Sequence, residues 1–278
     1  MNRIKTFRSP SPRIGVVIRF KNSASTLPAV LDSLRRQTVL PGLILGIDTG
    51  STDGSANLLR AFGATVVEWT EAYSHPCVLN FALERCPTDL VLILSSHTVL
   101  ESADAIERYV DAMSDPDTAC VSAKWDADPF YSDAIDWQEI KDRGLKFGSI
   151  YSNSMGMIRR SLWERIRFDE SMPTMEDYAW ALEQLRRGFR CRRLDVPFSY
   201  QRVGSAREFS FAVITFWLAS RHGPRVTWLG VRSTLGSLSR CIAASLFKRA
   251  DSVSSTIQIE AARLLARFLW PLIPRSGL

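Results

Sequence analysis

Residues 43–54 read LILGIDTGSTDG, an apolar run that ends in a loop rich in turn-forming residues. A short apolar run bounded by Gly, Asp and Ser is typical of a β-strand that is buried on both faces. Similar apolar runs lie at 14–20, 65–69, 90–94 and 119–123. The sequence therefore predicts a central sheet that contains these strands.

Amphipathic segments separate the predicted strands. Apolar side chains recur at helical spacing within 27–34, 58–62, 78–82 and 103–110. Apolar strands that alternate with such helices form βαβ units, in which helices cover both faces of a parallel sheet. The expected fold class is therefore α/β, with a Rossmann-like, mostly parallel sheet. Ligands of such sheets bind at the carboxyl ends of the strands.

The regular pattern loosens after residue 125. We expect an edge strand within 146–158 and helices with basic faces from residue 206 onward. The expected organisation is a polar lead-in at 1–13, an α/β domain at 14–205 and a helical C-terminal region at 206–278.

Positive charge is concentrated in the C-terminal part of the chain. From Gln201 onward there are 11 Lys and Arg against 3 acidic residues, while the whole chain has a net charge of +6. Basic helices that also carry apolar faces favour an anionic membrane surface. Three alternatives stay open: a solvated helical face, packing on the α/β domain, or formation of a dimer. Nucleic acid is disfavoured, because nucleic-acid binders usually gather Lys and Arg around aromatic platforms on one surface.

The sequence points to a cytoplasmic protein that lies on the inner face of the membrane. No stretch reaches the roughly 20 apolar residues that a spanning helix needs. The N-terminus has no apolar segment of the kind found in signal peptides. The five cysteines are odd in number and form no CxxC pair, which favours reduced thiols over disulfides or a zinc site.

Polar residues with suitable chemistry follow three of the predicted strands. Arg19 and Asn22 come at the end of the first strand, and their cationic and amide groups suit a nucleotide base or a phosphate. Asp48 ends the second strand, where a carboxylate can accept from a pyrimidine N–H or a ribose hydroxyl. Ser95-Ser96-His97 closes the strand at 90–94. Imidazole there can bind a metal or a phosphate, although a lone His is more often a structural hydrogen-bonding group.

An acidic pair, Glu176-Asp177, begins a predicted helix that ends near Gly188. The helix dipole stabilises negative charge at this end, so both carboxyl groups are expected to be ionised near neutral pH. An ionised carboxylate in a cleft can take a proton from an attacking hydroxyl. The alternative is ordinary helix capping, which is common for Asp and Glu.

Together and in this order, these motifs resemble glycosyltransferase family 2, the inverting enzymes of the GT-A fold, over about residues 14–202. The segments that carry the resemblance are LDSLRRQT at 31–38, IDTGSTDGS at 47–55, YSH at 73–75 with Asn80, NSMGMIRR at 153–160, FDE at 168–170 and EDYAWA at 176–181. The ordered set is far more specific than any one of them.

The resemblance implies a site with two sides. Residues 14–125 would form the nucleotide-binding half and 126–205 the acceptor half. The nucleotide-sugar side would contain Arg19, Asn22, Asp48, Asn80, Ser95, Ser96 and His97, with Asp48 near the base and Asn80 near the diphosphate. On the acceptor side, Asp177 would be the general base, Glu176 would assist it, and Trp180 would pack beside the acceptor sugar.

The chain departs from the usual family pattern at the metal site. Most members carry DxD at the end of the fourth strand, where this chain has Ser95-Ser96-His97, and many supply a His where this chain has Tyr200-Gln201-Arg202. Two alternatives stay open. His97 holds Mn²⁺ or Mg²⁺, or Arg and Lys side chains neutralise the diphosphate without a metal.

The function implied is transfer, with inversion, of a sugar from a nucleotide-diphosphate sugar to a hydroxyl of a glycan or lipid-linked acceptor in the synthesis of cell-surface polysaccharide. The missing DxD motivates an alternative, a catalytically inactive nucleotide-sugar-binding module with the same fold.

Overall fold

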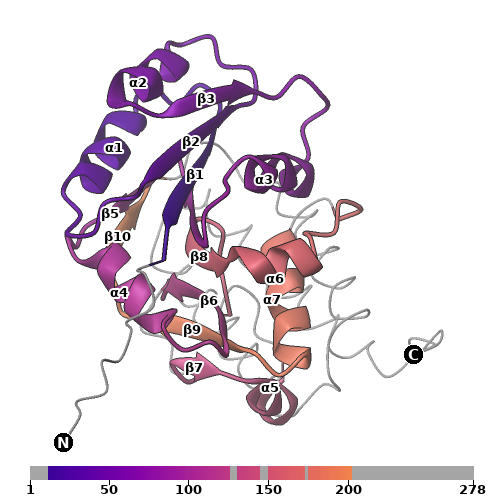
Figure 1. Ribbon diagram of the computed structural model, residues 1–278. Coiled ribbons are helices and arrows are strands. Elements are labelled where there is room, and N and C mark those ends of the chain that lie inside the picture. Colours follow the sequence, from indigo (N-terminus) through magenta and orange to yellow (C-terminus); the bar gives the residue numbers. More distant parts are fainter. Residues whose placement is uncertain (1–11, 126–129, 145–149, 173–174, 202–278) are drawn as a thin grey trace, which may run out of the picture.

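The computed structural model describes residues 12–125, 130–144, 150–172 and 175–201 (Figure 1). The predicted membrane-binding helices of 206–278 lie outside these residues. Within the described part of the chain, no helix has both the length and the apolar character needed to cross a membrane, and every described cysteine is a free thiol.

Strands and helices follow each other as the hydrophobic pattern predicts. The strands are β1 (Ile14–Phe20), β2 (Leu43–Asp48), β3 (Thr65–Glu68), β4 (Leu90–Ser95), β5 (Thr98–Leu100), β6 (Thr118–Ala123), β7 (Ala134–Ile135), β8 (Met155–Arg159), β9 (Arg190–Leu194) and β10 (Phe198–Tyr200). The helices are α1 (Leu27–Arg35), α2 (Ser55–Phe62), α3 (His75–Glu84), α4 (Ala105–Ala112), α5 (Trp137–Arg143), α6 (Arg160–Arg165) and α7 (Glu176–Arg186).

The main sheet has the strand order β3-β2-β1-β4-β8-β6-β9-β7, and β5 and β10 form a separate antiparallel pair. Strands β3, β2, β1 and β4 are mutually parallel, and β6 runs parallel to β9. The predicted fold class, a mostly parallel α/β sheet, is therefore confirmed.

The expected edge strand at 146–158 is wrong in its position. Strand β8 lies inside the sheet, antiparallel to β4 on one side and to β6 on the other. Its residues Met155–Ile158 are buried, as an interior strand requires. Gly156 allows the close approach of the chain that leads into β8, because an added Cβ would collide with the Ser152 carbonyl oxygen and the Tyr151 ring.

Both faces of the sheet are covered, and strand β4 shows why. Its side chains alternate between two cores: Val91 and Ile93 pack with residues of α3, α5, α6 and α7, whereas Leu90, Leu92 and Leu94 pack with residues of α1, α2 and α4. These two groups of helices lie on opposite sides of the sheet (Figure 1). Polar side chains are therefore left to the strand ends, where two opposed apolar layers no longer meet.

The strand register brings the predicted site residues to one edge. Arg19 pairs with Ser95 of β4, and Phe20 pairs with Asp48 of β2. The carboxyl ends of β1, β2 and β4 therefore lie side by side, as the parallel sheet predicts.

Candidate functional site

The loop after β2 is organised by Asp48. Its buried side chain accepts hydrogen bonds through Oδ1 from the backbone N–H groups of Gly50 (3.1 Å) and Ser51 (2.8 Å). Gly50 has a φ of 97°, a left-handed conformation that favours glycine. The other oxygen, Oδ2, receives no hydrogen bond from a described residue. Asp48 therefore shapes its loop with Oδ1, while Oδ2 makes no hydrogen bond within the described residues.

Asn22 joins the loop after β1 to the loop after β2. Its backbone adopts a φ of 48°, and its Oδ1 accepts from the Thr52 N–H at 2.8 Å. The Asn22 N–H in turn donates to Ser51 Oγ at 3.0 Å. The contacts given for Asn22 thus hold the two loops together.

The serines after β4 are part of the same framework. Ser96 Oγ lies 2.9 Å from Ser23 Oγ, and the Ser96 carbonyl oxygen accepts from Thr26 Oγ1 at 2.7 Å. Ser95 donates its backbone N–H to the Ser154 carbonyl oxygen at 3.0 Å. These hydrogen bonds fix the loop at 21–26 to the end of β4 and so hold the two strand ends in place relative to each other.

Arg19 carries the positive charge at the centre of this edge. One guanidinium nitrogen, Nη1, is buried and has no hydrogen-bond partner in the part of the chain that the structure describes. The guanidinium carbon lies 6.0 Å from the centre of the Tyr73 ring. A buried guanidinium N–H without an acceptor is costly, and a carboxylate or phosphate is the ligand that would satisfy it best.

Tyr73 and His75 belong to this site, although they were not among the residues predicted to bind. Tyr73 Oη lies 3.1 Å from His75 Nδ1. Tyr73 precedes α3, and His75 is in the first turn of that helix. Burial, and secondly the charge of Arg19, lower the pKa of His75 to about 3. The same two causes lower the pKa of His97. Both imidazoles are therefore neutral at pH 7, and Arg19 is the cation that acts on both of them.

The acidic pair is held by Asn153, in the loop that leads into β8. The Asn153 backbone N–H donates to Asp177 Oδ2 at 2.9 Å, and its Nδ2 donates to Glu176 Oε1 at 3.3 Å. Asp177 Oδ1 accepts from the Tyr178 N–H at 2.7 Å. Both carboxyl groups lie at the beginning of α7, as predicted. Asn153 begins the NSMGMIRR motif at 153–160. Its part in holding the acidic pair depends on a contact with Asp177, 24 residues away, that the sequence does not reveal.

The expectation that both acids are ionised near neutral pH is wrong for Glu176. Burial, and secondly the negative charge of Asp177, raise the pKa of Glu176 to about 7. The pKa of Asp177 is also raised by burial, but its two backbone N–H donors and Arg19 act in the opposite direction. Desolvation of a side chain that is 5% exposed thus outweighs the helix dipole. We infer that the proton of the pair resides on Glu176 and the negative charge on Asp177.

This difference predicts a pH-dependent gain in stability from Glu176→Gln. The folded chain binds more protons than the unfolded chain between pH 4.5 and about 7, so the Glu176 carboxyl lowers the free energy of unfolding as pH rises through this window. We expect the substitution to raise the free energy of unfolding by about 3 kcal/mol at pH 8.5 and to change it little at pH 4. Urea denaturation at both pH values measures it.

The matched control for that experiment is Glu183→Gln on the same helix. Glu183 is partly exposed and pairs with Arg187 at 3.0 Å, so its loss should change stability by less than about 1 kcal/mol at either pH. Equal effects of Glu176→Gln at pH 4 and pH 8.5 would contradict the raised pKa.

A comparison with known proteins gives the family. Residues 15–176, more than half of the chain, match the sequence profile described as Glycosyl transferase family 2. The chain belongs to glycosyl transferase family 2. This confirms the resemblance drawn from the motifs.

Two curated relatives are named as O-antigen chain rhamnosyltransferases. The chain is 27% identical over 198 residues to the O-antigen chain rhamnosyltransferase RfbN of Salmonella typhimurium, covering 64% of this chain and 62% of that protein. It is 24% identical over 176 residues to the O-antigen chain rhamnosyltransferase WbaN of Salmonella anatum, covering 57% and 56%. The chain thus spans about three fifths of the length of these relatives.

A solved structure supports the GT-A fold. The mannosyltransferase PcManGT of Pyrobaculum calidifontis, in complex with GDP-Man and Mn²⁺, aligns with a TM-score of 0.58 at 18% identity, over 94% of this chain and 71% of that one. At this identity the likeness concerns the fold alone.

The family resemblance implied that Asn80 lies near the diphosphate, but in this structure its side chain is hydrogen-bonded to other protein groups. Its Nδ2 donates to the Phe168 carbonyl oxygen and to Glu170 Oε1, both at 2.9 Å, and its Oδ1 accepts from Trp163 Nε1 and the Phe168 N–H. Protein groups thus occupy all the hydrogen-bonding capacity of the amide. We therefore leave Asn80 out of the proposed diphosphate site.

Trp180 is likewise occupied by the protein. Its indole N–H donates to the Ile166 carbonyl oxygen at 2.8 Å, and its rings pack near Phe168 and Tyr151. Only 2% of the residue is exposed, so it has no free face for a sugar. We leave it out of the proposed acceptor site.

The residues at the DxD position do not fit a divalent cation well. The residues on either side of His97, Ser96 and Thr98, carry no carboxylate. Among the described residues, no three His, Cys, Asp or Glu side chains lie close enough together to hold a metal ion. Mn²⁺ and Mg²⁺ prefer carboxylate ligands. The charge of Arg19, which acts on His97, would repel a second cation.

Proposed function

We propose that the chain is an inverting glycosyltransferase that moves a sugar from a nucleotide-diphosphate sugar to a hydroxyl of a glycan acceptor in cell-surface polysaccharide synthesis. One observation carries the proposal: the buried Arg19 Nη1 has no hydrogen-bond partner among the described residues, and Arg19 lies near enough to Glu176 and Asp177 to lower the pKa of both. A cation for a leaving diphosphate and a base for an attacking hydroxyl are thus combined in one site.

On the donor side, Asp48 and Arg19 have complementary tasks. Asp48 Oδ2 accepts from the base or the ribose, next to the loop that Oδ1 already shapes. The Arg19 guanidinium donates to the diphosphate oxygens, whose negative charge grows as the bond to the anomeric carbon breaks. His97 and His75 are neutral and act as hydrogen-bonding groups beside it.

On the acceptor side, Asp177 takes the proton. The acceptor oxygen attacks the anomeric carbon as the bond to the diphosphate oxygen breaks, and the hydroxyl proton passes to the Asp177 carboxylate. Asn153 and Tyr178 hold the carboxylate in one orientation. With its pKa raised to about 7, Glu176 is about half protonated at neutral pH, and we assign the uptake of the acceptor proton to Asp177.

We propose that Arg19 supplies the positive charge that neutralises the diphosphate. In other proteins of this fold, such as PcManGT, a bound metal ion is available for that task. PcManGT was solved with Mn²⁺ and GDP-Man, but the Ser95-Ser96-His97 donor set beside a guanidinium is poorly suited to that ion. The inactive-module alternative is not favoured, because the acidic pair is retained and oriented by Asn153.

The direct test is a screen of nucleotide sugars. We expect one of the GDP-, UDP- or dTDP-hexoses or deoxyhexoses to raise the melting temperature of the purified chain by mass action. The same compound should release its nucleoside diphosphate when an acceptor glycan is added. Binding without release across a panel of acceptors would favour the inactive module, and no binding at all would refute both functions.

A membrane-surface partner is a separate part of the proposal. The 11 Lys and Arg from Gln201 onward would hold the enzyme at the cytoplasmic face of the membrane, where lipid-linked acceptors lie. Flotation with vesicles of 30% phosphatidylserine tests it against a chain truncated after Arg207. Flotation that is absent, or unchanged by the truncation, would contradict it.

A further inference from the structure

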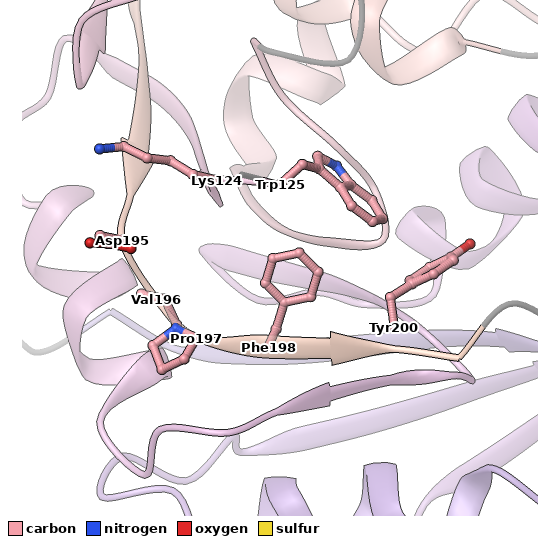
Figure 2. Close-up of a pocket in the computed structure, with 7 residues that line it drawn as sticks. All are labelled: Lys124, Trp125, Asp195, Val196, Pro197, Phe198 and Tyr200. Carbon is pink, nitrogen blue, oxygen red and sulfur yellow. The ribbon is translucent and has the colours of Figure 1, made fainter. Parts of the chain in front are cut away.

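A cavity opens near His97, in the part of the chain that follows β6 and β9. It measures about 360 Å³ and lies between the residues that follow β6 and the segment that runs from the end of β9 into β10. Figure 2 shows Trp125 on one side of the cavity and Phe198 and Tyr200 on the other. Its size falls within the range of small-ligand pockets.

Aromatic rings line this cavity. Trp125 meets Phe198 and Tyr200 edge to face, with ring centres 5.3 Å and 5.0 Å apart. Trp125 is 43% exposed, although it is among the largest apolar side chains of the chain. The exposed part of this indole, beside two further rings, can provide a stacking platform for a ring that is apolar on one face.

The polar groups of the cavity suit a neutral ligand with hydroxyl groups. Lys124, the cation in its lining, is already paired with Asp133 at 2.7 Å. The exposed Asp195 carboxylate, the Trp125 indole N–H and the Tyr200 hydroxyl make no hydrogen bond to a described residue. The lining therefore offers hydroxyl partners but no free positive charge, which disfavours a phosphate or a nucleotide.

The cavity adjoins the proposed active site through Tyr200, which contacts His97. The Tyr200 and His97 rings are 4.6 Å apart, and the Gln201 N–H donates to the His97 carbonyl oxygen at 2.9 Å. In the strand order, β6 lies on one side of β4, whereas β1 and β2, which carry Arg19 and Asp48, lie on the other. A ligand in the cavity would thus approach His97 from the side opposite Asp48.

We propose that this cavity binds a pyranose unit of the acceptor glycan, with a C–H face of the sugar on Trp125 and a hydroxyl on Tyr200. The proposal rests on the glycosyltransferase function, because it names a sugar unit of the acceptor that this function requires. It also explains why aromatic residues, and not a metal-binding His, occupy the segment at 198–200.

Sugar binding is tested by saturation-transfer NMR with methyl α-L-rhamnopyranoside, methyl α-D-mannopyranoside and methyl α-D-galactopyranoside. We expect at least one to bind the full chain, Trp125→Ala to weaken binding by about tenfold, and Trp125→Phe to retain most of it. Leu40→Ala, which alters an apolar side chain that is 63% exposed before β2, is the matched control and should bind as the wild type does.

Three results would overturn the proposal. These are no binding of any methyl glycoside, equal binding by Trp125→Ala and Leu40→Ala, and displacement of the glycoside by UDP, GDP or dTDP, which would make the cavity a nucleotide site. Failure of the glycosyltransferase function is seen separately, as wild-type protein that binds a methyl glycoside in this cavity but neither binds nor cleaves any nucleotide sugar.

Discussion

Asp177→Asn is expected to lower the rate of sugar transfer by about 10²- to 10⁴-fold, the usual contribution of a general base. The neutral amide cannot take the acceptor proton. Its oxygen can still accept a hydrogen bond from the Asn153 or Tyr178 N–H, so the helix start should persist. Nucleoside diphosphate release gives the rate, and calorimetry gives the dissociation constant of the nucleotide sugar, which should change by less than about threefold.

A titration separates the loss of a base from a distorted site. The charge of Asp177 is one of the causes that raise the pKa of Glu176 to about 7. Removal of that charge should lower the Glu176 pKa, which carboxyl-carbon NMR follows directly. Asp32→Asn, on the outer face of α1 and paired with Arg36, is the control and should leave both rate and titration unchanged. Full activity of Asp177→Asn would show that another group is the base.

The sequence predicted the frame of the site because the frame depends on local patterns. Apolar runs gave the strands, and the parallel pairing that follows from βαβ units brought Arg19, Asp48 and Ser95 to one edge. These inferences need only the period of the side chains and the turn residues between them. The same holds for Glu176-Asp177 at the start of α7.

What the sequence could not predict depends on burial and on distant partners. The helix dipole suggested an ionised Glu176, but the dipole is a local effect and desolvation depends on the whole fold. The family resemblance placed Asn80 near the diphosphate, whereas its hydrogen-bond partners in the structure lie 83 and more residues away. No local pattern reveals such partners. Trp125 and Tyr200 meet only after β6 and β9 have paired.

Whether the reaction needs a metal ion depends on whether Arg19 neutralises the diphosphate. Arg19→Gln should lower the transfer rate by about 10²- to 10³-fold, as expected for the loss of a group that stabilises developing negative charge. Because Arg19 lowers the pKa values of Glu176 and Asp177, its removal should also raise them. The acidic limb of the pH–rate profile then moves to higher pH, which a purely structural role would not cause. Arg13→Gln, which removes an exposed charge paired with Asp89 at the other end of β1, should leave the profile unchanged.

The same role makes a prediction about metal removal. If the guanidinium neutralises the diphosphate, excess EDTA should change the wild-type rate by less than about twofold, whereas a metal acting as Lewis acid is worth several kcal/mol of transition-state stabilisation. Mn²⁺ that restores EDTA-treated enzyme by more than tenfold would refute the role of Arg19 and favour His97 as a ligand. Loss of activity in Arg19→Gln together with insensitivity to EDTA would mean that this chain replaced the metal of its family by a fixed cation on β1, with Ser95-Ser96-His97 in place of DxD as its mark in the sequence.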